Sequence, residues 1–150
     1  MKMMGVDYGD ARTGIAISDY SGTIVGETAV ITHWNREEVI RQASEIARAK
    51  NISRIIVGLP KNMNGTEGER ARLCREFANL LAEASGIETI LWDERNTTVD
   101  AHRILSENNV KGKKRKQTVD AVAASLILEG YLMFASIHNN SEDQKGDRSE

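Results

Sequence analysis

Apolar and polar positions alternate along the first third of the chain, which predicts consecutive β-strands. These strands are expected over residues 2–8, 14–19 and 23–32. Between the first two, Gly9 and Gly14 bound a short polar segment, and glycine is typical of tight turns. Because short turns join antiparallel neighbours, the chain should begin with three antiparallel strands.

From residue 36 the apolar residues recur at helical spacing instead, which predicts a helix over residues 36–50. Its apolar positions are Val39, Ile40, Ala43, Ile46 and Ala47. Strands and helices then alternate: a strand over residues 55–58, a helix over 67–85, a strand over 87–92, a helix from near Thr97 and a last helix over 117–134. The sequence therefore predicts an α/β fold. Its mixed five-stranded sheet has three antiparallel strands, then parallel additions, and is flanked by helices on both faces.

One domain accounts for most of the chain, and we expect it to span residues 1–137. Residues 138–150 are predicted to be a disordered polar tail, because they show no apolar periodicity. The polar and basic stretch over residues 108–116 is expected to be a mobile loop before the last helix.

Composition narrows the class of protein. The 150 residues are 40% hydrophobic and 28% charged with a net charge of −2, which is ordinary for a globular domain. The single cysteine, Cys74, excludes an internal disulfide, and Asp7 interrupts the N-terminal apolar run too early for a secretory signal. The apolar runs look too short to cross a bilayer. We therefore expect a cytoplasmic protein that has no membrane partner.

Asp7 is the first candidate for chemistry, because an apolar strand ends in this carboxylate. A buried acid is costly unless it is paired or holds a metal ion. The alternative is an ordinary acid at the end of a strand that caps the following turn.

Glu94 and Asp120 stand in similar settings. Glu94 directly follows the predicted fifth strand, and ligands of open α/β sheets bind at the carboxyl ends of strands. Asp120 shares its helical face with apolar residues, the small Ala123 and Ala124 and then Ile127. For both, the alternative is an acid near a helix N-terminus, where the helix dipole favours negative charge.

Three carboxylates that converge repel one another until a cation arrives, and hard divalent ions such as Mg²⁺ prefer oxygen ligands. Such a site could polarise a phosphodiester and generate hydroxide. The sequence therefore predicts a Mg²⁺ or Mn²⁺ site built from Asp7, Glu94 and Asp120.

Four stretches resemble the YqgF family, whose members are described as Holliday junction resolvases or pre-16S rRNA nucleases with a ribonuclease-H-like fold. They are Asp7-Tyr8-Gly9-Asp10-Ala11-Arg12-Thr13-Gly14-Ile15-Ala16, Val57-Gly58-Leu59-Pro60 with Met63-Asn64-Gly65-Thr66, Asp93-Glu94-Arg95-Asn96-Thr97-Thr98, and the stretch from Val119 to Leu128. The resemblance implies that Asp7, Glu94 and Asp120 are the catalytic, metal-binding acids. Asp10 and Asp100 are further acids near these stretches and are expected to be solvated.

Cations near these acids are candidates for contacts with substrate phosphates. Arg12 lies in the first turn, where it could also be a surface arginine, and Arg95 follows Glu94, where it could also form a simple ion pair. A dense basic run contains Lys113, Lys114, Arg115 and Lys116. Beside a metal site we expect this run to bind phosphates, although such runs are often only solvated surface.

The remaining chemistry-bearing residues have structural interpretations. His33, His102 and His138 are scattered without ligand spacing, Cys74 falls on an apolar helical face, and Trp34 and Trp92 are expected to pack in the core.

The sequence thus predicts a metal-dependent nuclease, monomeric or weakly dimeric. Its first expected substrate is the ribosomal RNA precursor, at the 5′ end of pre-16S RNA, and the second is branched DNA. Two alternatives stay open: a nucleotide-binding module related to actin and the sugar kinases, which would need a second domain, and a non-catalytic nucleic-acid-binding scaffold.

Overall fold

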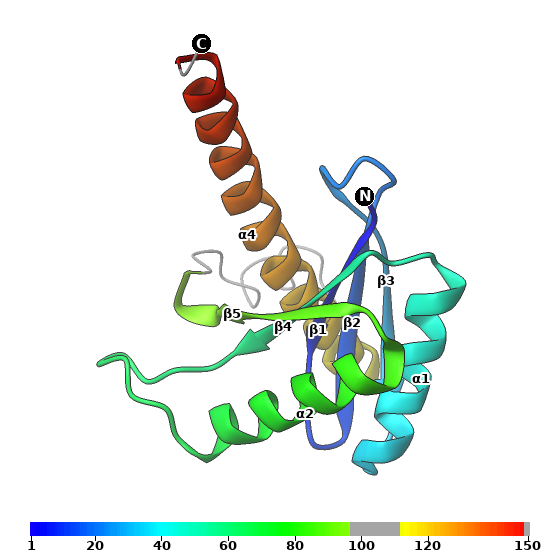
Figure 1. Ribbon diagram of the computed structural model, residues 1–150. Coiled ribbons are helices and arrows are strands. Elements are labelled where there is room, and N and C mark those ends of the chain that lie inside the picture. Colours follow the sequence, from blue (N-terminus) through cyan, green and yellow to red (C-terminus); the bar gives the residue numbers. More distant parts are fainter. Residues whose placement is uncertain (97–111, 149–150) are drawn as a thin grey trace.

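A five-stranded sheet in the order β3-β2-β1-β4-β5 forms the centre of the protein (Figure 1). The computed structural model describes residues 1–96 and 112–148, with the side chains of residues 1–95 and 119–138. The strands are β1 (Met3–Asp7), β2 (Arg12–Ser18), β3 (Val25–Thr32), β4 (Arg54–Leu59) and β5 (Glu88–Asp93). The first three pair antiparallel, whereas β4 adds to β1 and β5 adds to β4 in parallel. The predicted mixed sheet is confirmed.

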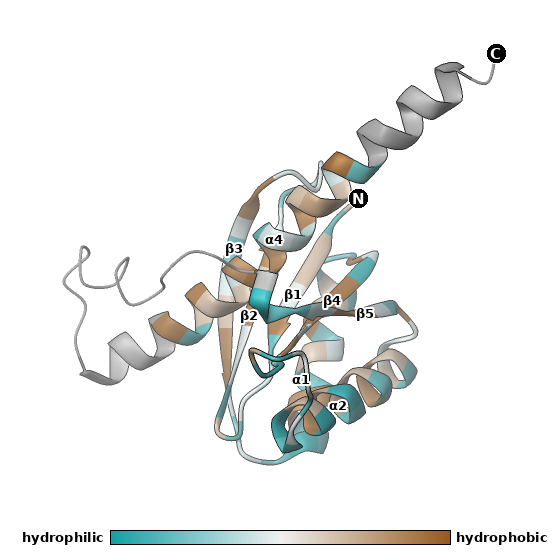
Figure 2. Ribbon diagram, turned by 90° about the vertical axis from the view of Figure 1, so that its left-hand side faces the viewer, coloured by the Kyte–Doolittle hydropathy of each residue, from teal (hydrophilic) through white to brown (hydrophobic). Residues whose placement is uncertain are grey.

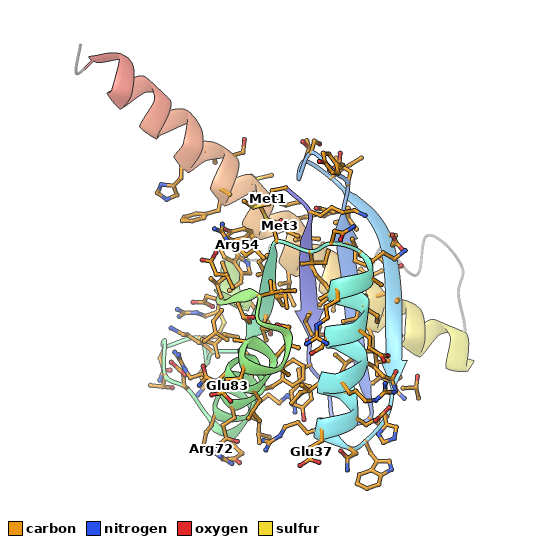
Figure 3. The ribbon with its side chains drawn as sticks, turned by 45° about the vertical axis from the view of Figure 1, so that its right-hand side comes forward. Met1, Met3, Glu37, Arg54, Arg72 and Glu83 are labelled. Atoms are coloured by element: carbon orange, nitrogen blue, oxygen red, sulfur yellow. The ribbon has the colours of Figure 1, made fainter. Side chains whose placement is uncertain are left out.

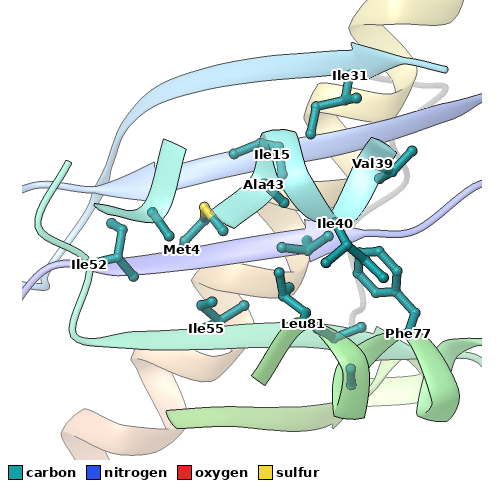
Figure 4. Close-up of a cluster of buried hydrophobic side chains, with 14 of the residues drawn as sticks. Met4, Ile15, Ile31, Val39, Ile40, Ala43, Ile52, Ile55, Phe77 and Leu81 are labelled. Atoms are coloured by element: carbon teal, nitrogen blue, oxygen red, sulfur yellow. The ribbon is translucent and has the colours of Figure 1, made fainter. Parts of the chain in front are cut away.

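Helices α1 (Arg36–Ala49) and α2 (Glu69–Ser85) cover one face of this sheet. Asn35 begins α1, since its side chain accepts a hydrogen bond from the Glu38 backbone N–H at 3.1 Å. Figure 4 shows Ile40 of α1 and Phe77 and Leu81 of α2 among apolar side chains of the strands. Alternation along β1 sends Met4 and Val6 into this core and leaves Asp7 for the other face.

Helix α4 (Gly112–Arg148) covers the opposite face, and Figure 2 shows it on the far side of the sheet from α1 and α2. A second core forms beneath it from Met3, Ala16 and Ile56 of the strands and from Ala124, Ile127, Leu128, Tyr131 and Leu132 of the helix. The small residues Ala16 and Ala124 let helix and sheet approach closely.

Helix α4 is longer than predicted at both ends. Residues 112–116 are helical, although a loop was expected there, because lysine and arginine favour helix even without an apolar stripe. Residues 139–148 are also helical, although a disordered tail was expected. Extending an existing helix costs less than starting one, so the packed residues before them support this extension. The helix predicted from Thr97 lies outside the described residues.

The expectation that every apolar run is too short to span a bilayer is wrong. The stretch Val119–His138 is long enough and apolar enough, with a mean hydropathy of 1.5. Its apolar residues include Leu128, Tyr131 and Leu132, which are buried against the sheet. In this structure 28% of the stretch is buried, through the residues that face the sheet.

Candidate functional site

Asp7 and Asp120 meet where α4 crosses the end of β1. In the sheet register Asp7 lies opposite Gly14 of β2. A Cβ atom on Gly14 would lie 2.0 Å from the backbone oxygen of Asp120, so only glycine allows α4 this close. The strand pairing and the helix contact therefore bring two acids that are far apart in sequence to one edge of the sheet.

Glu94 reaches the same edge from β5. It is the first residue of the short 3₁₀-helix η1 (Glu94–Asn96), which follows β5 directly. A Cβ atom on Gly58 of β4 would lie 2.5 Å from Oε1 of Glu94 and 2.5 Å from Cδ1 of Ile127 in α4. The Glu94 carboxyl group thus lies over β4 on the face covered by α4, as Asp7 does on β1.

The negative charges of these acids raise the pKa values of Asp7 and Glu94. The pKa of Asp7 is raised from 3.8 to about 6, first by burial and then by the charge of Asp120. The pKa of Glu94 is raised from 4.5 to about 7, first by burial and then by the charge of Asp7. Among the described residues, no hydrogen bond or ion pair reaches either carboxyl group. We call Asp7, Glu94 and Asp120 the acidic edge.

Arg12 joins the acidic edge from the start of β2. Its Nε donates to Oδ2 of Asp120 at 3.0 Å, and both side chains are partly exposed. Arg12 was predicted to contact a substrate phosphate. In this structure it neutralises the third acid, and its partial exposure leaves room for an incoming phosphate.

Arg95 is bound to Asp93 and not to Glu94. Its backbone N–H donates to Asp93 Oδ1 at 2.9 Å, and its Nη2 lies 2.7 Å from Asp93 Oδ2. This pairing lowers the pKa of Asp93, whereas the pKa of the adjacent Glu94 is raised. Of the two roles considered for Arg95, a phosphate contact or a simple ion pair, the structure contains the ion pair.

Arg70 is a residue that the sequence analysis missed. From the first turn of α2 it donates to the backbone oxygen of Tyr8, pairs with Asp10 at 2.8 Å and covers the Tyr8 ring at 5.3 Å. Its charge also lowers the pKa of Asp7 and Glu94. One signal could have found it: a cation in the first turn of a helix opposes the helix dipole, which suggests a role elsewhere.

The other predicted residues have mixed outcomes. Asp10 pairs with Arg70, and Cys74 is buried with a raised pKa, as an inert thiol should be. Trp92 packs edge-on against Tyr131, but the prediction that Trp34 packs in the core is wrong, because Trp34 is 78% exposed. Outside the described residues lie Asp100, His102 and the side chains of Lys113, Lys114, Arg115 and Lys116.

The carboxylates fit a hard divalent cation in part. Asp7 and Glu94 offer oxygen ligands, and their repulsion favours an added positive charge. Over residues 1–96 and 112–148, however, no three His, Cys, Asp or Glu side chains are already arranged to hold a metal ion. Asp120 is bound by Arg12 instead. Within the described part of the chain, the site is therefore a pair of acids without a bound partner and a third acid beside them.

The sequence matches a known family and named relatives. A family model described as "RuvX: Holliday junction resolvase" matches residues 1–133. A protein of Bacillus cytotoxicus named "Putative pre-16S rRNA nuclease" is 45% identical over 134 residues, which is 88% of this chain and 98% of that protein. A protein of Halothermothrix orenii with the same name is 43% identical over 134 residues, covering 89% and 96%.

Solved structures share the fold. Thermus thermophilus RuvC in complex with a Holliday junction substrate has a TM-score of 0.60 at 11% identity, covering 90% of this chain and 96% of that one. The fowlpox virus resolvase bound to Holliday junction DNA has a TM-score of 0.55 at 15% identity, covering 90% and 99%. At such low identity the likeness concerns the fold alone, and it confirms the predicted fold class.

Proposed function

The chain belongs to the RuvX family, and from this premise we propose that it is a metal-dependent nuclease that hydrolyses phosphodiester bonds in structured nucleic acid. The observation that carries the proposal is the pair Asp7 and Glu94. A fold that leaves two acids close together, partly buried and unpaired among the described residues, favours a cation at that place.

Each residue of the acidic edge has a role in this proposal. Asp7 and Glu94 would hold Mg²⁺ or Mn²⁺, with Asp120 as a further ligand. The bound ion would polarise the scissile phosphate and lower the pKa of a water molecule. Arg12 can exchange its bond to Asp120 for one to a phosphate oxygen, since both interactions are charge-assisted. Arg70 holds the backbone directly after Asp7, and so fixes the direction of that carboxyl group.

A precursor of 16S ribosomal RNA is the substrate that we favour, and the cytoplasm is the expected place of action. Relatives at 43% and 45% identity are named "Putative pre-16S rRNA nuclease" and match over nearly their whole length. A four-way DNA junction is the second candidate, because the family description names it and a protein of the same fold was solved with it.

The test is a cleavage panel with purified protein. The substrates are a 16S precursor with its 5′ extension, single strands of the same sequence, and four-way junctions, each with Mg²⁺, with Mn²⁺ and with chelator. Asp7→Asn should lower cleavage by more than the roughly 10–100-fold that losing a residue behind a metal ligand costs. Glu45→Gln is the matched control, since Glu45 is an exposed acid paired with Arg41 on α1.

Metal-dependent cleavage that is lost in Asp7→Asn and kept in Glu45→Gln would support the nuclease. Tight binding of the precursor without cleavage under any metal condition would instead identify a nucleic-acid-binding scaffold.

A further inference from the structure

The exposed indole of Trp34 has no role in the function proposed above. Trp34 lies between the end of β3 and Asn35, the residue that caps α1. Its side chain is 78% exposed, although an indole offers one of the largest apolar surfaces of any residue. Exposed tryptophans of this kind are frequent contact points for partners.

The backbone and ring beside Trp34 are held in place. The His33 ring stacks on the indole with centroids 5.8 Å apart and planes 22° apart. The backbone N–H of Asn35 donates to Nδ1 of His33 at 2.9 Å, and the Asn35 side chain caps α1. A preorganised ring pair loses less conformational entropy when a ligand stacks on it.

The rings of His33 and Trp34 lie at the same end of the sheet strands as the acids. Thr32, the last residue of β3, pairs with Arg12, which in turn binds Asp120. Because β3 is two strands away from β1, the ends of these strands lie about 10 Å apart. Figure 3 labels Glu37 at this end of the molecule, and Met1 and Met3 at the other.

We propose that the His33–Trp34 ring pair is a stacking platform for an unpaired base of the substrate strand, a few nucleotides from the bond cleaved at the acidic edge. Every base offers a face to an aromatic ring, so such a platform is tolerant of sequence. The inference rests on the proposed nuclease function and adds that the strand is unpaired where it passes β3. The acids Glu37 and Glu38 stand in the next turn, so the platform acts by stacking and not by attracting phosphate.

Binding of two RNA probes tests the platform. One probe is a single strand about ten nucleotides long, within the usual span of such sites, and the other is the same sequence as a blunt duplex. All proteins carry Asp7→Asn so that the probes stay intact. Trp34→Ala should weaken single-strand binding about tenfold, the effect of losing one stacked base, and leave duplex binding unchanged. Trp34→Phe keeps a ring and should lose much less.

Tyr20→Ala is the matched control. Tyr20 is 84% exposed and lies in the β2–β3 connection, at the opposite end of the sheet. It should bind both probes as the parent does. The slope of affinity against salt concentration should be the same in all variants, since no phosphate contact is removed.

Fluorescence gives a direct readout of stacking. The chain has two tryptophans, and Trp92 is partly buried with its ring edge-on to Tyr131. A saturating single strand should quench the emission of the parent protein and leave that of Trp34→Phe unchanged.

Equal single-strand affinities of Trp34→Ala and Tyr20→Ala, or unquenched emission at saturation, would overturn the platform and leave the nuclease function standing. A flatter salt slope in Trp34→Ala would also overturn it, because the lost contact would be to phosphate. If the Asp7→Asn parent binds neither probe and the wild type cleaves no substrate of the panel, the proposed function is overturned as well.

Discussion

The acids of the outer helical surface and those of the acidic edge have opposite surroundings. On α1, on α2 and in the loop before α2, Glu38, Glu67 and Glu69 are each bound by an arginine, which lowers their pKa. On the edge, burial and mutual repulsion raise the pKa of Asp7 to about 6 and that of Glu94 to about 7. These three surface acids are therefore compensated by arginines, whereas Asp7 and Glu94 have raised pKa values that a bound cation would lower.

Asp93 and Glu94 make this contrast within two consecutive residues. Asp93 is bound by Arg95, which lowers the pKa of Asp93. Glu94 lies over Gly58, and its pKa is raised. The chain leaves the strand between them and enters η1, so the two carboxyl groups meet different surroundings. Sequence proximity to an arginine does not decide which acid the arginine compensates.

The largest expected effect concerns cations that reach a substrate. The surface arginines Arg41, Arg72 and Arg75 already bind acids of the chain. We therefore expect phosphate contacts from the basic run at the start of α4. Neutralising Lys113, Lys114 and Arg115 should flatten the salt dependence of binding by about one unit of slope for each lost contact. The cleavage rate at saturating substrate should stay nearly the same.

The control neutralises Arg41, Arg72 and Arg75 together, which removes the same charge from the outer surface. The affinity of both triple variants is measured as a function of salt concentration, which shows whether the basic run contacts phosphates. If the two variants show the same slope, the basic run is ordinary solvated surface.

Helix α2 contains one arginine beside the acidic edge, Arg70, and one on the outer surface, Arg72. Arg70 holds the turn after Asp7, whereas Arg72 pairs with Glu69 and Glu76 on the surface. Arg70→Gln should lower the cleavage rate roughly 10–100-fold, as loss of a residue behind a metal ligand does. It should also move the acid limb of the pH–rate profile to higher pH, because Arg70 lowers the pKa of Asp7 and Glu94.

Arg72→Gln should leave both the rate and the pH profile unchanged. A loss of rate in Arg70→Gln without any movement of the profile would mean that Arg70 supports the turn alone.

Stability should respond in opposite directions to removing an acid from the two regions. The pKa of Asp7 is higher in the folded protein than its ordinary 3.8, so its ionisation destabilises the fold as the pH rises from about 4 to about 6. In chelator, Asp7→Asn should therefore equal the wild type below this window. Above it, the variant should be more stable by as much as about 3 kcal/mol, because a rise of roughly two pKa units corresponds to about 1.4 kcal/mol per unit.

Glu38→Gln is the matched surface variant. The pKa of Glu38 is lowered to about 2, so its stabilising effect is present above its ordinary 4.5 and is lost as the pH falls toward 2. This variant should be no more stable than the wild type at neutral pH. Melting curves across pH measure both, and Mg²⁺ should stabilise the wild type more than Asp7→Asn. An Asp7→Asn protein that is clearly less stable in chelator at neutral pH would show a structural acid.

The sequence predicted the elements better than the surroundings of single residues. Alternation along β1 and helical spacing along α1 depend on neighbours in sequence, so both were found. Asp7, Glu94 and Asp120 attracted notice as acids at the ends of apolar segments, and the structure brings them to one edge, while their catalytic role stays a prediction. Arg70 was missed and Trp34 was misjudged because tertiary packing decides what lies beside each side chain: Arg70 meets the Tyr8 carbonyl, whereas Trp34 stays 78% exposed.

The smallest expected effect is at the far end of α4. Residues 124–135 of the helix pack on the sheet, whereas Figure 1 shows its C-terminal part running beyond the sheet, away from α1 and α2. A chain that ends at Ile137 keeps Leu128, Tyr131 and Leu132 in the core, so its melting temperature and cleavage rate should equal those of the full chain. A chain that ends at Ser125 loses these residues and should not fold, because each large buried side chain contributes on the order of 1.5–3 kcal/mol. Thermal melts and the cleavage panel compare the three lengths. A clear drop in either quantity for the chain ending at Ile137 would give the last turns of α4 a part in the domain.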